Sequence, residues 1–131
     1  MTREELQDRS LKFAAALRPF CQRIRAIHDG RSVGAQLLDC SSSIAANYRA
    51  ACRSRSRAEF IAKVGTVVEE SDETVFWLEY IVEGNFLPAA DVLAHFDEAR
   101  QLCAIFTASH ATARRNYARE IERKKAMKRR L

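Results

Sequence analysis

The stretch SRAEFIAKVGTVVEESDETVFWLEYIVEGN, residues 56–85, decides the fold. It opens on Ser56-Arg57-Ala58-Glu59, a capping box in which the serine oxygen accepts the N3 amide hydrogen and the glutamate reaches back to the cap amide. A broad apolar stripe at helical spacing follows: Phe60, Ile61, Val64, Val67, Val68, Val75, Leu78, Ile81 and Val82. Gly84-Asn85 then ends the segment. The stretch predicts a single helix about 40 Å long, since each residue adds 1.5 Å.

Three further segments show helical spacing of apolar residues. The first runs from about Glu4 to His28 and contains Pro19, where we expect a kink or a break into two pieces. The second, from about Ser32 to Arg53, is rich in small residues and is therefore expected to lie centrally. The last begins at Pro88, a favoured first-turn residue, and runs to about Asn116 or onward into the basic tail.

The connections between these segments are short, at about residues 29–31, 54–55 and 85–87. Short loops between long helices force antiparallel neighbours. We therefore predict an all-α, antiparallel up-down-up-down four-helix bundle over residues 1–116, with a basic C-terminal helical extension over residues 117–131. Only six of 131 residues are Gly or Pro, too few for a β-sandwich or barrel. No apolar run reaches the roughly 18 residues of a membrane span.

The net charge of +5 is a property of the C-terminal tail. Residues 114–131 contain nine basic and two acidic residues and carry +7, whereas the other residues sum to 13 − 15 = −2. The basic residues of the tail are Arg114, Arg115, Arg119, Arg123, Lys124, Lys125, Lys128, Arg129 and Arg130. Such a tail can bind phosphates and release their counterions. Alternatively, it is a solvated, fraying helix end, where cations favour the helix C-terminus.

A second basic group falls at the turn between the second and third helices and consists of Arg49, Arg53, Arg55 and Arg57. Arginine is suited to this role because its guanidinium can grip a phosphate bidentately. The same arginines are also candidates to neutralise an acidic cluster on the third helix. The sequence therefore leaves open whether this group serves a ligand or the protein itself.

The acidic cluster consists of Glu69, Glu70, Asp72 and Glu73. Like charges one helical turn apart repel each other, so the cluster needs cations. We expect them to come from Arg49 and Arg53, or from another subunit. A solvated surface and an all-oxygen metal site are the remaining interpretations.

Three aromatic residues, Phe76, Trp77 and Tyr80, lie away from much of the apolar stripe of the third helix. That helix is therefore apolar on more than one side. Surplus apolar surface of this kind marks an interface, so we predict that these residues contribute to a homo-oligomer.

Signatures of catalysis are missing from the sequence. The residues three positions before His28, His95 and His110 are not glutamates, so the Glu-x-x-His motif of di-iron bundles is absent. No Gly-rich phosphate loop occurs, and Ser41, Ser42 and Ser43 have no nearby base. We expect no enzyme activity, no cofactor and no metal.

The cysteines lie far apart in the sequence, at Cys21, Cys40, Cys52 and Cys103, and form neither a CxxC pair nor a zinc pattern. We expect reduced, mostly buried thiols that act as small apolar residues. The N-terminus has no apolar signal region. Both features are typical of a cytoplasmic protein.

Several motifs together resemble the bacterial four helix bundle protein family. The stretches are QLL (36–38), SIAANYRAACR (43–53), SRAEFIAK (56–63), EESDET (69–74) and WLE (77–79). The family includes proteins encoded in intervening sequences of large-subunit ribosomal RNA genes and the accessory variability determinant of diversity-generating retroelements. The similarity extends from about Leu11 to Asn116. Members often have Arg-Ser after Gln-Leu-Leu, where this chain has Asp39-Cys40, so a phosphate or subunit contact made by that arginine is missing here.

The resemblance implies a barrel-like homopentamer with a positively charged surface and no cofactor. In the retroelement members, that surface binds nucleic acid and a reverse transcriptase. We therefore expect a non-enzymatic oligomeric scaffold that binds RNA or DNA, in a reverse transcriptase or ribosomal RNA context. A protein-interaction module without a specific nucleic-acid role is the alternative.

Overall fold

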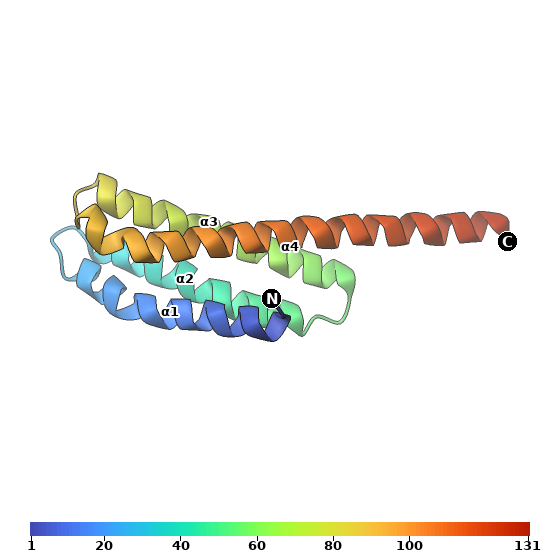
Figure 1. The fold of residues 1–131 in the computed structure, drawn as a ribbon, viewed down its shortest axis with the longest axis horizontal. Coiled ribbons are helices and arrows are strands. Elements are labelled where there is room, and N and C mark those ends of the chain that lie inside the picture. The colour runs from blue at the N-terminus through green and yellow to red at the C-terminus, as the bar shows by residue number, and fades with distance from the viewer.

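Four α-helices and no strands make up the computed structural model, which describes all residues 1–131 (Figure 1). The helices are α1 (Arg3–Arg25), α2 (Arg31–Cys52), α3 (Arg57–Glu83) and α4 (Ala89–Arg130). Successive helices run in opposite directions, which confirms the predicted all-α four-helix bundle. None of the helices combines the length and apolarity needed to cross a membrane.

Capping side chains fix where two of the helices begin. A complete capping box lies at α1, where Thr2 Oγ1 accepts the Glu5 amide hydrogen at 3.1 Å and Glu5 accepts that of Thr2 at 3.0 Å. This box was not predicted from the sequence. At α3 only half of the predicted box forms: Ser56 accepts from the Glu59 amide at 3.1 Å, but the Glu59 carboxylate accepts from the Arg55 amide instead of that of Ser56.

The turns differ from expectation in detail. Helix α1 ends at Arg25, before His28, and Asp29 in the following turn has φ 63°. Asn85 after α3 has φ 60°, a left-handed conformation that Asn and Asp tolerate because their short polar side chains bond locally. Pro19 lies inside a continuous α1, so the predicted break does not occur.

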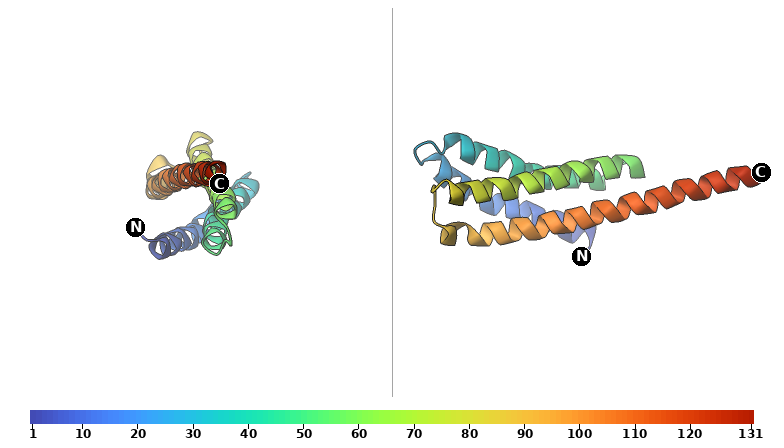
Figure 2. Two further views of the ribbon diagram at one scale, coloured as in Figure 1. Left: turned by 90° about the vertical axis from the view of Figure 1, so that its right-hand side faces the viewer. Right: turned by 90° about the horizontal axis from the view of Figure 1, so that it is seen from above.

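The core is formed by packing α1 against α2, α2 against α3, and α3 against α4 (Figures 1 and 2). Its fully buried side chains include Leu17, Ile24, Leu37, Ile44, Leu78, Ile81, Leu102 and Phe106. Two of the four free thiols are also buried, and burial raises the pKa of Cys21 to about 12 and that of Cys40 to about 11. These two cysteines fill the role of small apolar residues, whereas Cys52 and Cys103 are only partly buried.

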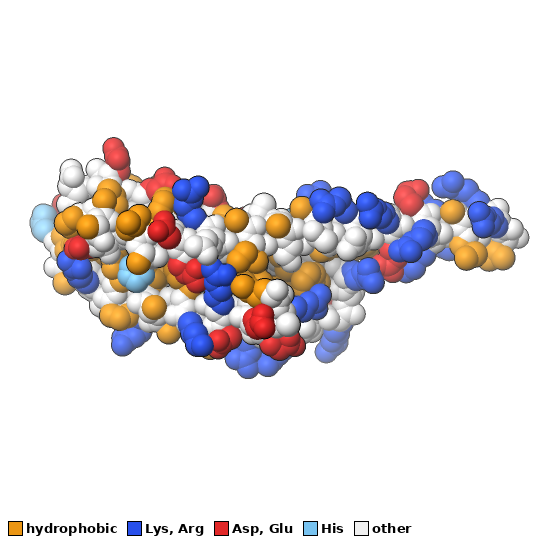
Figure 3. Space-filling view, viewed as in Figure 1, with side chains coloured by type: hydrophobic (Ala, Val, Ile, Leu, Met, Phe, Trp, Pro, Cys, Tyr) orange, Lys and Arg blue, Asp and Glu red, His pale blue; other side chains and the backbone are white.

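Helix α4 continues well past the end of the other three helices (Figures 1 and 2). Its last fully buried residue is Phe106, and every residue of the segment 121–131, which we call the overhang, is exposed. Figure 3 shows Lys and Arg side chains gathered along it. The predicted helical extension is therefore an uninterrupted part of α4, and no loop separates it from the bundle at residue 116.

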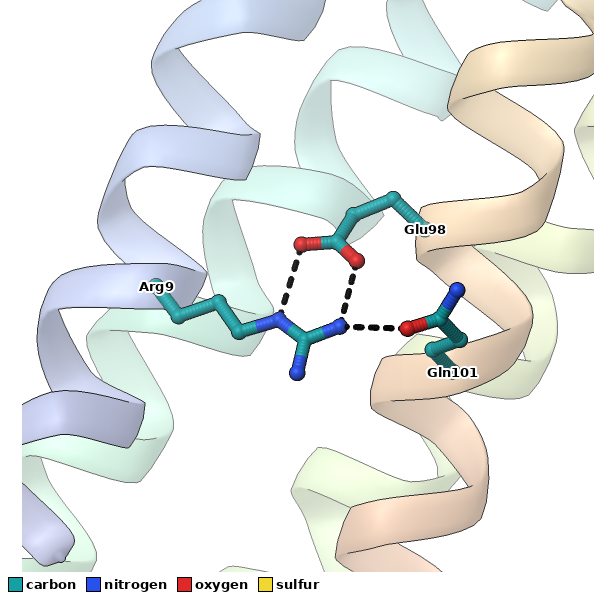
Figure 4. Close-up of polar contacts among 3 residues, drawn as sticks. All are labelled: Arg9, Glu98 and Gln101. Atoms are coloured by element: carbon teal, nitrogen blue, oxygen red, sulfur yellow. Dashed lines mark hydrogen bonds and ion pairs between the residues drawn. The ribbon is translucent and has the colours of Figure 1, made fainter. Parts of the chain in front are cut away.

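Polar contacts bridge α1 and α4, which pack against each other much less closely than successive helices do. Arg9 on α1 donates to both Glu98 oxygens at 2.6 and 2.9 Å, and also to Gln101 at 2.9 Å (Figure 4). Arg23 pairs with Asp91 at 3.0 Å nearer the other end. A bidentate guanidinium–carboxylate pair fixes geometry as well as charge, so it sets how α4 lies beside α1.

The substitution Leu37→Ala tests the core, because Leu37 is fully buried on the central helix α2. We expect it to lower the free energy of unfolding by about 2–5 kcal/mol, through lost burial and the cavity left behind. Urea unfolding followed by circular dichroism measures the change. Leu11→Ala on exposed α1 surface is the control and should stay within about 0.5 kcal/mol of the parent. Equal effects of the two substitutions would contradict the core described here.

Candidate nucleic-acid interface

The turn between α2 and α3 closes one side of a cavity of about 490 Å³. Arg55 and Arg57 line it, as the grouping of basic residues at this turn suggested. Arg49 and Arg53, at and just after the end of α2, do not line it. Arg3 at the start of α1 supplies a third guanidinium. The structure thus joins cations from three segments, one of which the sequence analysis did not select.

Two of the three guanidiniums in this cavity are unpaired. Arg3 lies over the Phe60 ring, with its guanidinium carbon 4.4 Å from the ring centroid, and makes no ion pair or hydrogen bond through its side chain. The Arg55 side chain likewise has no ionic partner, whereas Arg57 pairs with Glu120 at 3.1 Å. Ser54 Oγ, which also lines the cavity, is buried without a hydrogen-bond partner.

A second cavity of about 670 Å³ adjoins the first, since Arg57 and Asn116 line both. Arg119 and Arg123 extend its lining along α4 towards the overhang. Of the remaining tail cations, two lie beside α3 and five on the overhang: Arg114 and Arg115, then Lys124, Lys125, Lys128, Arg129 and Arg130. One continuous basic surface therefore runs from the α2–α3 turn to the end of α4.

Few acids interrupt this basic surface. Glu120 is shared between Arg57 and Lys124, and Glu122 lies 3.8 Å from Lys125. The Glu120 oxygen that faces Arg57 is buried, whereas Lys124 and Lys125 are exposed, so their pairs contribute little to stability and these two cations remain available to other anions.

The acidic cluster is not neutralised by Arg49 and Arg53, so that expectation is wrong within the chain: none of its four carboxylates forms an ion pair. The antiparallel register explains this. Arg49 and Arg53 lie opposite the first turns of α3, whereas the middle of α3 faces the middle of α2, as the contact of Thr74 with Cys40 at 3.2 Å shows.

The side chain that acts on the cluster from α2 is another acid, Asp39. The pKa of Glu70 is raised mainly by burial, and further by the negative charges of Glu73, Glu69 and Asp39. The carboxylates do not converge on a point where a metal ion would sit. Between Val64 and Ala99 the chain has nine acidic residues and no Lys or Arg, so this half of α3 and the start of α4 are strongly acidic.

Of the three aromatic residues in the second half of α3, two are exposed and one is packed against the core. Phe76 is 52% and Tyr80 45% exposed, whereas Trp77 packs against the core with its indole N–H buried and unpartnered. The three rings contact one another with centroids 5.0–6.1 Å apart. Phe76 and Tyr80 line an apolar groove of about 630 Å³ with Leu93 of α4, which is 57% exposed. An exposed apolar groove is a candidate interaction surface.

Comparison with known proteins identifies the fold. No family model matches the sequence, and no curated protein matches it. A solved structure does: a protein with unknown function from the S23 ribosomal protein family of Bacteroides thetaiotaomicron superposes with a TM-score of 0.78. The two sequences are 23% identical, and the match covers 85% of this chain and 99% of the other. The chain therefore shares a small all-helical bacterial fold with that protein.

Replacing Glu70 by Gln tests whether the acidic cluster is unpaired. The pKa of Glu70 is raised in the folded state, so the unfolded state releases this proton more readily. The free energy of unfolding of the protein therefore falls as pH rises. We expect Glu70→Gln to raise the melting temperature at pH 7, with the gain shrinking as pH falls below the ordinary value of 4.5. Thermal melts of the parent and the variant at pH 7 and at a pH below 4.5 measure this difference.

The control for that substitution is Asp97→Asn, which removes a charge from exposed surface of α4 outside the cluster. It should change the melting temperature less. A loss of stability in Glu70→Gln at neutral pH would instead show that cations of a second copy neutralise the cluster.

Proposed function

We propose that this protein is a non-enzymatic, oligomeric scaffold of the bacterial four helix bundle family that binds nucleic acid in the cytoplasm. The overhang of α4 carries the proposal. It holds six cations against one acid, all of its residues are exposed, and its first turn continues the arginine-lined surface of the bundle. Its charge is almost all positive and its apolar side chains Met127 and Leu131 are exposed, so this part of α4 offers its surface to a partner outside the chain.

The partner of such a helix is a polyanion. Arginine and lysine around its whole circumference meet phosphates from several directions, and each neutralised phosphate releases counterions. Tyr117 is the only aromatic residue in the tail, so base stacking contributes little and recognition is tolerant of sequence. The structural neighbour has unknown function and bears the name of the S23 ribosomal protein family, so we propose a ribosomal RNA context first and a reverse transcriptase as the other setting.

The absence of catalysis in this proposal is supported by the chemistry of the buried groups. Burial raises the pKa values of Cys21 and Cys40, which keeps both as unreactive thiols. Burial also lowers the pKa of His95, whose ring packs at 4.7 Å from that of Phe20. The two thiols are enclosed by the core, and His95 is half-buried against Phe20.

Truncation after Ile121 tests the role of the overhang. It removes six cations and one acid, a net +5, and spares Glu120, which pairs with Arg57. We expect weaker binding to a 20-base-pair DNA, with the slope of log K against log salt reduced by roughly 0.9 for each phosphate no longer neutralised. Fluorescence anisotropy at several salt concentrations measures it.

The folded state of the truncated protein is checked by its thermal melt, which should match that of the full chain because every residue removed is exposed. Unchanged affinity together with an unchanged salt slope would make the overhang a bystander. The alternative function, a protein-interaction module, would then be preferred.

The oligomer is proposed to form through the aromatic groove, as a homopentamer by the family resemblance. We expect the parent protein to have a mass several times that of the 14.9 kDa chain, and the double substitution Phe76→Ser, Tyr80→Ser to shift it towards monomer. Light scattering after size exclusion measures the mass. Leu11→Ser, at an equally exposed position of α1, should not change it. A parent protein that is monomeric at micromolar concentration would overturn the proposal.

A further inference from the structure

The cavity at the α2–α3 turn differs from the rest of the basic surface because it is concave and built from several elements. Arg3 comes from the first turn of α1, Arg55 from the turn, and Arg57 from the first turn of α3. On the overhang, by contrast, every cation projects from a single helix into solvent. Guanidiniums that converge from separate segments can surround one small anion.

The positive charge in the cavity is only partly balanced by the protein, through the pair of Arg57 with Glu120. No carboxylate is among the lining residues. The two acids beside it are each shared with a lysine: Glu59 pairs with Lys63 at 2.9 Å and Glu120 with Lys124 at 3.2 Å. Helices α1 and α3 begin at this end of the bundle and α2 ends there, so the C-terminus of α2 offsets one of the two N-termini and the partial positive charge of the other adds to the field.

The donors around the cavity lack acceptors. The buried Ser54 Oγ has no hydrogen-bond partner, and a buried hydroxyl left in that state costs free energy. Arg3 is held in place by the Phe60 ring without using its N–H groups in any hydrogen bond or ion pair. Oriented but unused donors next to unbalanced positive charge define a site for an anion with several acceptor oxygens.

We propose that this cavity binds a single phosphate group of a nucleic acid, with Arg3, Arg55 and Arg57 as its cationic ligands and Ser54 as a hydroxyl donor. Phosphate fits better than a carboxylate because its oxygens can accept from several guanidiniums and a hydroxyl at once. The phosphate is either a terminal monoester or a backbone diester. The assignment rests on the proposed nucleic-acid binding and names the point at which the strand is anchored. From there the adjoining cavity leads past Arg119 and Arg123 to the overhang.

The first test titrates inorganic phosphate into the full-length, isotope-labelled protein at constant ionic strength, with chloride as the reference salt. Saturable amide shifts are expected at Arg3 and at residues 54–58. The variant Arg3→Gln, Arg55→Gln should weaken phosphate binding at least about tenfold, the effect of losing charge-assisted hydrogen bonds. Arg57 is left in place because it also pairs with Glu120.

The matched control is Arg18→Gln, Arg31→Gln, which removes the same charge from exposed positions at the opposite end of the bundle. It should bind phosphate as the parent does. Shifts that do not saturate, that chloride reproduces, or that the control variant loses equally would overturn the assignment.

The second test compares a short single-stranded oligonucleotide carrying a 5′-phosphate with the same strand carrying a 5′-hydroxyl. A preference for the phosphorylated strand that disappears in Arg3→Gln, Arg55→Gln assigns the cavity to a terminal phosphate. Equal binding of both strands, weakened at least about tenfold by the variant, assigns it to a backbone phosphate. Binding of both strands that the variant leaves unchanged overturns the proposal.

The two tests separate this inference from the wider proposal on function. If inorganic phosphate gives no saturable shift while the full chain still binds DNA with a steep salt slope, the cavity assignment fails and nucleic-acid binding through the overhang stands. If phosphate binds in the cavity but no oligonucleotide binds the full chain, nucleic-acid binding fails and the cavity remains a site for a small phosphate.

Discussion

Antiparallel packing of four amphipathic helices through short turns is the constraint on which the rest of the molecule depends. Each helix must bury one apolar stripe, and connections of a few residues leave only a sequential neighbour to bury it against. The start of α1, the turn between α2 and α3, and the middle of α4 are therefore brought to the same end. The arginine-lined cavity exists because that end is where these three segments meet.

The same register separates the charges of the molecule. Facing positions of α2 and α3 are set by distance from their shared turn, so Asp39 acts on Glu70 while the arginines at the end of α2 face only the beginning of α3. The acids around Glu70 consequently raise its proton affinity, and the cations near the turn are left for another partner. Acidic and basic surfaces thus occupy different parts of one small bundle.

Helix α4 is longer than the core against which it packs. Burial ends at Phe106, and the ion pair between Arg57 and Glu120 is the last contact with another helix that fixes its direction. Beyond that point the helix is supported by one-turn pairs such as Lys124 with Glu120, and by cations near its C-terminus, where the helix dipole favours them. Tertiary packing does not stabilise the overhang, so its cations are available to a ligand on every side.

Local patterns in the sequence determined the four helices, their antiparallel order and the basic tail, because apolar spacing, turn residues and charge runs act over a few neighbouring positions. They did not determine that the Glu59 carboxylate would accept from the Arg55 amide, because that hydrogen bond depends on the path of the turn before α3. Nor did they show that Arg3 would join Arg55, or that an acid would lie opposite Glu70. Those outcomes follow from which residues far apart in the chain come to face each other. Only the tertiary structure decides that, since the register between helices is set by the packing of the whole core.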